Sequence, residues 1–136
     1  MGWTMTDKIS FDLVSPERLL LSENAEMVTV PGTEGEMGVM AGHMPLITTL
    51  KPGTVDVKIA HGDHHLFLVS GGFAEITASK ITVLAEEAIP VASLDEATIT
   101  QRIVDAEEEI ATAKTDAEMT KARGMLDHLK HLRAAL

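Results

Sequence analysis

The composition of the chain changes abruptly at Pro90, and this change limits the possible folds more than any other feature of the sequence. Nine of the ten glycines and all five prolines lie at or before Pro90, while the rest of the chain is rich in Ala, Glu and Lys. Glycine and proline are typical of turns between strands and are unfavourable inside helices. The sequence therefore predicts a β domain over residues 8–90 and a helical unit over residues 93–136.

Before Pro90, short apolar runs with period-two alternation recur between turn signals. Each run is too short for a helix, and the spacing is typical of an antiparallel β-sandwich or barrel. We expect the apolar positions of these runs to form the core: Ile9, Phe11, Leu13, Val28, Val30, Val55, Val57, Ile59, Leu66, Leu68, Ile81 and Val83.

After Pro90 the sequence predicts two helices that pack as an antiparallel hairpin. Ser93 with Glu96 forms a capping-box pattern for the first helix, and Thr115 with Glu118 forms one for the second. One continuous helix would place polar or small residues in the apolar seam, so we expect a break at residues 114–116. The seam residues are Ile99, Ile103, Ala106, Ile110 and Ala113 in the first helix and Met119, Ala122, Leu126, Leu129, Leu132 and Leu136 in the second.

Charge and composition exclude several classes of function. The chain carries 21 acidic and 11 basic side chains, a net charge of -10 at pH 7, and only 3% aromatic residues. An acidic protein with few aromatic side chains is poorly suited to nucleic acid, so we expect no nucleic-acid partner. The absence of cysteine excludes disulfides and Cys-based zinc sites.

The sequence has no run of about 18 apolar residues that would cross a membrane and no secretory signal pattern at its N-terminus. We therefore expect a soluble protein that stays inside the cell. Residues 1–4 are expected to be a disordered leader, with Met5 as a second candidate start.

Candidates for chemistry are few. The sequence has no phosphate-binding loop, no nucleophile elbow and no zinc-protease motif. His61, His64 and His65 with Asp63 could bind a divalent metal, which would suit a metal-dependent β-barrel enzyme. A polar hairpin tip is the favoured interpretation, because strand alternation sends His64 and His65 to opposite faces. The acidic pairs and runs at residues 86–87 and 107–109 are interpreted as solvated surface.

Residues 31–45 concentrate glycine and methionine between two strands. Such a segment suits an adaptable contact loop, because glycine permits tight turns and methionine packs against irregular surfaces. The alternative, slightly favoured from spacing, is that Met37, Met40 and Met44 fill the core.

The predicted second helix carries a basic strip on an otherwise acidic protein. It consists of Lys121, Arg123, Lys130 and Arg133, together with His128 and His131. Two interpretations stand about even: the strip recognises an acidic partner, or its charges merely complement the helix dipole.

Six short blocks carry a family resemblance. They are FDLVSPER at 11–18, VPGTEGE at 30–36, GH and PL at 42–46, LKPG at 50–53, SGGF at 70–73 and VLA at 83–85. In order and spacing they resemble the epsilon subunit of bacterial F-type ATP synthases. The resemblance implies a flattened sandwich of about ten strands followed by two antiparallel helices, in agreement with the periodicity.

The resemblance also implies a function. It points to a non-catalytic rotor subunit that couples proton flow through the membrane c-ring to ATP synthesis, without a cofactor of its own. Its implied partners are the gamma subunit and the c-ring, and Glu36 and His43 match family positions at these contacts. It implies a peripheral place at the cytoplasmic face of the bacterial inner membrane, reached through protein partners because the acidic charge disfavours lipid.

For the helices the resemblance is weaker. In several relatives they inhibit ATP hydrolysis by contacting the catalytic alpha and beta subunits, and the basic strip is the candidate for that contact. In some relatives they bind ATP through an I/L-D-x-x-R-A motif, which Leu94 and Asp95 begin here but Thr98 and Ile99 do not complete. ATP binding is therefore disfavoured, because a phosphate-binding arginine is missing. The residues for a nucleotide site, or for a free-standing nucleotide sensor, would be Asp95, Arg123 and Arg133.

Overall fold

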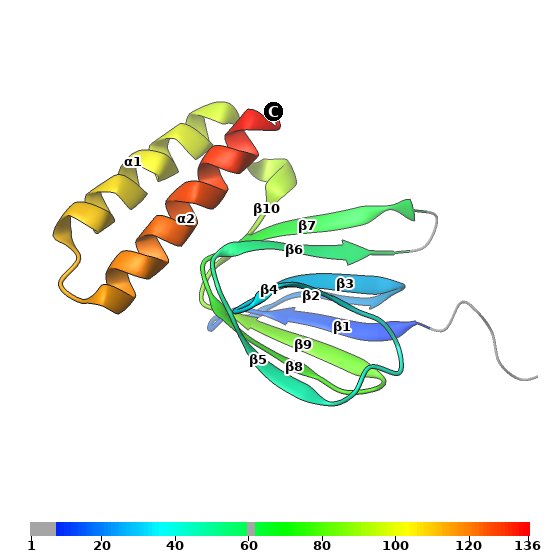
Figure 1. Cartoon of the computed structure of the whole chain (residues 1–136). Coiled ribbons are helices and arrows are strands. Elements are labelled where there is room, and N and C mark those ends of the chain that lie inside the picture. Colours follow the sequence, from blue (N-terminus) through cyan, green and yellow to red (C-terminus); the bar gives the residue numbers. More distant parts are fainter. Residues whose placement is uncertain (1–7, 60–61) are drawn as a thin grey trace, which may run out of the picture.

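The computed structural model of the chain describes residues 8–59 and 62–136; the expected leader and His61 lie outside these residues. Ten strands precede two antiparallel helices (Figure 1). The elements are β1 (Ile9–Val14), β2 (Leu19–Ala25), β3 (Met27–Gly32), β4 (Gly35–Val39), β5 (Leu46–Leu50), β6 (Gly53–Lys58), β7 (His64–Val69), β8 (Gly72–Ile76), β9 (Lys80–Ala85), β10 (Ala88–Pro90), α1 (Glu96–Thr112) and α2 (Asp116–Ala134). The predicted fold class, a β-sandwich followed by a helical hairpin, is confirmed.

The strands form one curled sheet in the order β10-β7-β6-β3-β5-β8-β9-β1-β2, with β4 paired to β3. The sheet folds over so that its two halves face each other (Figure 1). One pair of strands differs from the predicted antiparallel arrangement: β1 and β9 run parallel to each other. The partner of β1 lies late in the sequence, so a short antiparallel turn cannot join the two strands.

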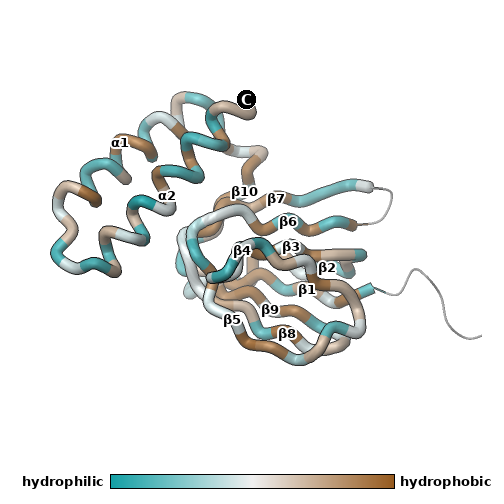
Figure 2. Tube along the Cα trace, in the orientation of Figure 1, coloured by the Kyte–Doolittle hydropathy of each residue, from teal (hydrophilic) through white to brown (hydrophobic). Residues whose placement is uncertain are grey.

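The sandwich core follows the predicted alternation in most strands. Its fully buried members include Ile9, Phe11 and Leu13 of β1. Figure 2 shows the alternation of hydrophobic and hydrophilic residues along the strands. The prediction is wrong for β7, where Phe67 and Val69 point into the sandwich core. The predicted core residue Leu66 is exposed, Leu68 belongs to another cluster, and Ile59 is only partly buried.

The hairpin packs against the outer face of β7 through a second apolar cluster. The cluster's buried members are Leu68, Leu94, Ile99, Ile103, Ala106 and Leu129. The second half of β7, residues 67–69, is thus buried on both faces, which explains why its apolar residues do not simply alternate. The predicted helix seams are confirmed at Ile99, Ile103, Ala106, Ala122 and Leu129, which are buried, and at Leu126 and Leu132, which pack against the cluster. Ile110, Ala113 and Met119 are only partly buried and lie outside the cluster, and Leu136 is exposed.

One of the two predicted helix starts is correct. Thr115 caps α2, since its hydroxyl accepts a hydrogen bond from the amide of Glu118 at 3.1 Å. The Ser93 cap is wrong, because a 3₁₀ turn at Val91–Ser93 occupies Ser93 and its hydroxyl donates to the Pro90 carbonyl. Asp95 caps α1 instead, accepting from the amide of Thr98 at 2.7 Å.

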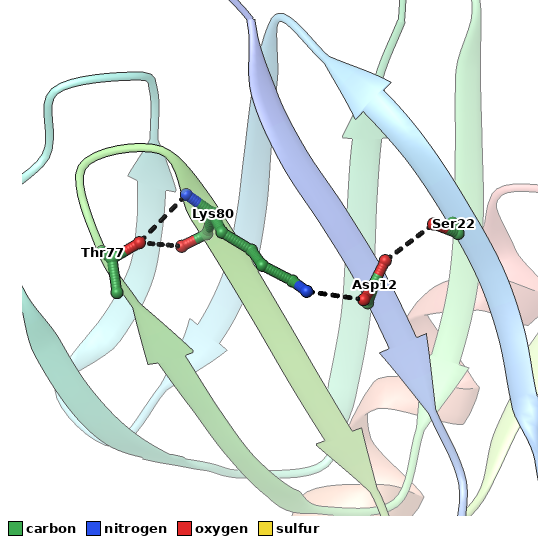
Figure 3. A network of polar contacts seen from close by, with 4 residues as sticks. All are labelled: Asp12, Ser22, Thr77 and Lys80. Atoms are coloured by element: carbon green, nitrogen blue, oxygen red, sulfur yellow. Dashed lines mark hydrogen bonds and ion pairs between the residues drawn. The ribbon is translucent and has the colours of Figure 1, made fainter.

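A polar network ties β1 to both of its neighbours (Figure 3). The Asp12 carboxylate accepts a hydrogen bond from the Ser22 hydroxyl on β2 at 2.8 Å and pairs with Lys80 on β9 at 3.1 Å. The Ser22 hydrogen bond, followed by the Lys80 contact, holds the pKa of Asp12 below its usual value. Thr77, whose hydroxyl bonds to the backbone of Lys80, closes the adjacent β8–β9 turn.

Candidate partner-docking site

The outer face of β5, β8 and β9 exposes large apolar side chains. Ile47 on β5 is 69% exposed and Phe73 on β8 is 49% exposed, and Leu84 on β9 is also exposed. Phe73 lies between Thr49 and Leu84 as their register partner, so these three side chains share one face. We call Ile47, Thr49, Phe73 and Leu84 the β5–β8–β9 face.

A shallow groove of about 440 Å³ continues this face toward the ends of β1 and β9. It is lined by Val14, Ser15, Pro16, Thr49, Gly72, Phe73, Leu84, Ala85 and Glu86. Contiguous exposed apolar surface on a folded protein is typical of a site that another molecule covers. The geometry suits a broad protein contact rather than enclosure of a small substrate.

The loop between β4 and β5 exposes two more apolar side chains. Met40 is 58% exposed and Met44 is 79% exposed, whereas Met37 packs against the sandwich core. The core-filler interpretation is therefore right only for Met37. The loop is held in place by the amide of Gly42, which donates to the Ala78 carbonyl in the β8–β9 turn at 2.7 Å. Met40 and Met44 are thus displayed from an anchored loop.

Glu36 lies at the start of β4, and His43 lies beyond its end. Glu36 is exposed near the start of the strand, opposite Pro31 of β3. His43 lies in the loop beyond its end, half-buried, with Nδ1 2.7 Å from the Met44 carbonyl oxygen. The strand separates the two, so they belong to different ends of the sandwich.

The basic strip is divided between two environments. Lys121 forms an ion pair with Glu86, at the junction of the hairpin and the sandwich. Arg123, Lys130 and Arg133 are exposed, and none forms an ion pair within the described residues. They remain available to a partner.

A cavity of about 680 Å³ lies between the hairpin and the sandwich. Its lining consists of Ser70, Glu87, Ala97, Thr98, Gln101, Arg102, Asp105, Ala106, Glu109, Lys121, Met125 and Leu129. The three nucleotide candidates Asp95, Arg123 and Arg133 are not among these residues. Asp95 is used as the helix cap, and its hydrogen bonds with Thr98 lower the pKa of its carboxyl.

Sequence reasoning missed the second ion pair at this junction, between Arg102 of α1 and Glu87 at 3.1 Å. Glu86 and Glu87 are solvated, as the sequence predicts, and each also pairs with a cation of the hairpin. The only indication of these ion pairs in the sequence was the pair of adjacent glutamates before the helices. The cation that pairs with Glu87 lies 15 residues further along the chain, and the cation that pairs with Glu86 lies 35 residues further.

The histidine cluster has a different arrangement from a metal site. His64 Nδ1 lies 2.6 Å from an Asp56 carboxylate oxygen on the neighbouring strand β6, and His65 is exposed beside it on β7. Within residues 8–59 and 62–136 no three His, Asp or Glu side chains are placed to hold a metal ion. His61, the third member of that hypothesis, lies outside the described residues.

Comparisons with known proteins all point to one family, and the matches to relatives cover nearly the whole chain. The family model of the ATP synthase delta/epsilon chain β-sandwich domain matches residues 8–91. The ATP synthase epsilon chain of Parvibaculum lavamentivorans is 47% identical over 129 residues, covering 95% of this chain and 98% of the relative. The epsilon chain of Mesorhizobium japonicum is 48% identical over 132 residues, covering 97% and 98%.

Two solved structures share the fold. A chain of the Euglena gracilis mitochondrial ATP synthase, in a structure of OSCP, F1 and the c-ring, matches with a TM-score of 0.75 and 25% identity, over 99% of this chain and 85% of that one. A chain from the central stalk and c-ring of the Tetrahymena thermophila enzyme matches with a TM-score of 0.64 and 14% identity, over 96% and 99%. Among the described residues, neither helix is long and apolar enough to cross a membrane.

Proposed function

This chain belongs to the ATP synthase epsilon-chain family, and we propose that it is a non-catalytic subunit of the rotor in an F-type ATP synthase. In this role it couples proton flow through the c-ring to ATP synthesis, while catalysis resides on other subunits. We place it at the cytoplasmic face of the bacterial inner membrane, attached through its protein partners.

The observation that carries the proposal is the β5–β8–β9 face. It exposes three large apolar side chains beside Thr49, lies on a sheet rather than on loops, and continues into the groove beside β1. A two-layer sheet is more rigid than a loop, and its broad outer face offers the area that a stable protein partner needs. We assign this face to the gamma subunit.

The loop carrying Met40 and Met44 is the proposed contact with the c-ring, since it lies at one end of the sandwich and exposes adaptable side chains. His43 belongs to this loop and remains a candidate for the same contact. Glu36 lies at the other end of β4, so we propose it as a contact with a different surface of the rotor.

An assembly experiment tests the gamma assignment. The double variant Ile47→Asp with Phe73→Asp is expected to reduce retention of the chain in the purified enzyme at least about tenfold, because two charges would be buried in an apolar contact. Its fold should be unchanged, since both side chains are exposed in the isolated chain. Leu66→Asp, which changes an exposed leucine on β7 in the same way, is the control. Normal retention of the double variant would refute the assignment.

We also propose that the hairpin regulates ATP hydrolysis. Its apolar cluster is separate from the sandwich core, and Arg123, Lys130 and Arg133 are exposed for an acidic segment of the alpha or beta subunits. Such an element can leave the sandwich without unfolding it.

Truncation after Ala92 is expected to raise ATP hydrolysis by the complete enzyme several-fold, because the proposed inhibitory element is removed. The measurement compares steady-state hydrolysis and proton-driven synthesis by enzymes with the intact and truncated chains. Unchanged hydrolysis with normal synthesis would contradict inhibition and leave the function to the sandwich.

A further inference from the structure

Among the residues that the structure describes, three polar contacts between side chains join the hairpin to the sandwich. Two are the ion pairs of Lys121 with Glu86 and of Arg102 with Glu87, whose acidic side chains are more than half exposed. Exposed ion pairs contribute little to stability. The third contact joins His128 of α2 to Thr54 of β6, with Nε2 2.6 Å from Oγ1, and it is partly buried. Because this hydrogen bond is partly buried, its strength depends more on the local environment than the strength of the two exposed ion pairs does.

The contact lies beside the apolar centre of the docked hairpin. Thr54 and Leu68 are register partners on β6 and β7. Leu129, the residue after His128, is 1% exposed and belongs to the same cluster as Leu68. His128 and Leu129 therefore contact neighbouring positions of the sheet, and the imidazole cannot become fully hydrated unless the helix moves away.

Charges around the imidazole come from two elements. His131, on the same helix, stacks with it at a centroid distance of 6.3 Å, and the charge of Glu36 on β4 also acts on it. The β6 strand presents the neutral Thr54, while its Asp56 carboxylate is occupied by His64. Burial has the largest effect and lowers the pKa of His128; the neighbouring His131 lowers it further, while the charge of Glu36 raises it. Within the described residues, no charged side chain of α1 contributes to this pKa shift.

We propose that His128 and Thr54 form a pH-sensitive docking contact that holds the hairpin on the sandwich at neutral pH and weakens in acid. A half-buried imidazolium beside a second histidine is less stable than one in water. Protons therefore bind better to the undocked hairpin, and docking is strongest above about pH 6.5, the usual pKa of histidine. It weakens as the pH falls below that value. The inference concerns docking alone and holds whether or not the hairpin regulates hydrolysis.

Thiol labelling of the full chain measures docking directly, because the chain has no cysteine of its own. Leu68→Cys introduces a thiol that is covered by the docked hairpin, and its labelling rate is divided at each pH by that of Ala78→Cys, an exposed position in the β8–β9 turn. Shortening this buried side chain weakens docking by itself. Because the substitution is present in every variant and at every pH, the comparison uses ratios of docking constants within this background. Between pH 7.5 and pH 5.5 the docking constant is expected to fall several-fold, and at most about tenfold, the limit for one histidine of ordinary undocked pKa.

The variant His128→Gln, made with Leu68→Cys, keeps a hydrogen-bonding side chain but does not titrate, so its docking constant should not change with pH. His65→Gln is the matched control, since it removes an exposed histidine outside the contact and should behave like the parent. Glu36→Gln should steepen the loss in acid, because it removes the charge that favours the imidazolium. An equal pH dependence in the parent and His128→Gln, or none in the parent, would overturn the proposal.

Thr54→Val tests the sheet side of the contact. Valine has a similar shape but cannot hydrogen-bond the imidazole, so the docking constant at pH 7.5 should fall several-fold. Docking equal to that of the parent would show that the contact does not hold the hairpin.

Discussion

Gly72→Ala is expected to destabilise the chain more than any other single glycine substitution. Gly72 opens β8 with φ +135°, and a Cβ atom there would lie 2.0 Å from the carbonyl oxygen of Leu84 and 3.0 Å from Cα of Ala85. Both atoms belong to the backbone of β9, and Gly72 is the register partner of Ala85. A methyl group can therefore fit only if β8 and β9 separate at this point.

Gly35→Ala is the matched control for this experiment. Gly35 has nearly the same φ, +132°, but an added Cβ would meet nothing within 4 Å. Both substitutions carry the conformational cost of alanine in this region, about 1–3 kcal/mol, whereas only Gly72→Ala adds the steric overlap, worth about 1–3 kcal/mol or more. Urea unfolding of the full-length variants measures the difference. Equal losses in the free energy of unfolding would show that the close approach to β9 is unimportant.

Leu68→Ala is expected to loosen the hairpin while leaving the sandwich folded. Leu68 is buried, but it faces the helices and not the sandwich core. Truncating a buried leucine to alanine costs about 2 kcal/mol or more, which corresponds to a roughly thirtyfold loss of docking. Hydrogen exchange should show this loss in the amides of α1 and α2, with little change in β1 or β9.

Val69→Ala gives the opposite pattern, because Val69 is the next residue on β7 and packs inside the sandwich. It should lower the protection of the strand amides and the free energy of unfolding of the sandwich. If Leu68→Ala and Val69→Ala reduced protection in the same residues by the same factor, the two apolar clusters would behave as one cooperative unit. That result would contradict a separable hairpin.

Local signals in the sequence predicted much of the fold. The alternation at Ile9, Phe11 and Leu13 places those side chains in the core, and Thr115 with Glu118 starts α2 as expected. Such features depend on neighbours within four residues, so they can be recognised without a tertiary structure. The cap at Ser93 was wrong for a local reason as well, because a 3₁₀ turn competes for the same residues.

The candidate site was only partly predictable. The composition of residues 31–45 indicated a contact loop or core filler, and only the fold separates exposed Met40 and Met44 from packed Met37. The β5–β8–β9 face was not predicted, since Ile47, Phe73 and Leu84 lie on three different strands and share a face only through the pairing of those strands. An apolar residue at an outward position has the same local signal as one in the core.

By itself the sequence determined the β-then-helix order, the helix break, most of the sandwich core and the family, because periodicity, capping residues and motif blocks are written along a continuous stretch of chain. Only the tertiary structure decided that the second half of β7 is buried on both faces. It also decided that Glu86 pairs with Lys121, that Glu87 pairs with Arg102 and that His128 contacts Thr54. These contacts join residues 15 to 74 positions apart. Many side chains of the hairpin and the sheet are equally polar or apolar, so the packing of the hairpin on the sheet determines which of them are in contact. No local sequence pattern specifies that packing.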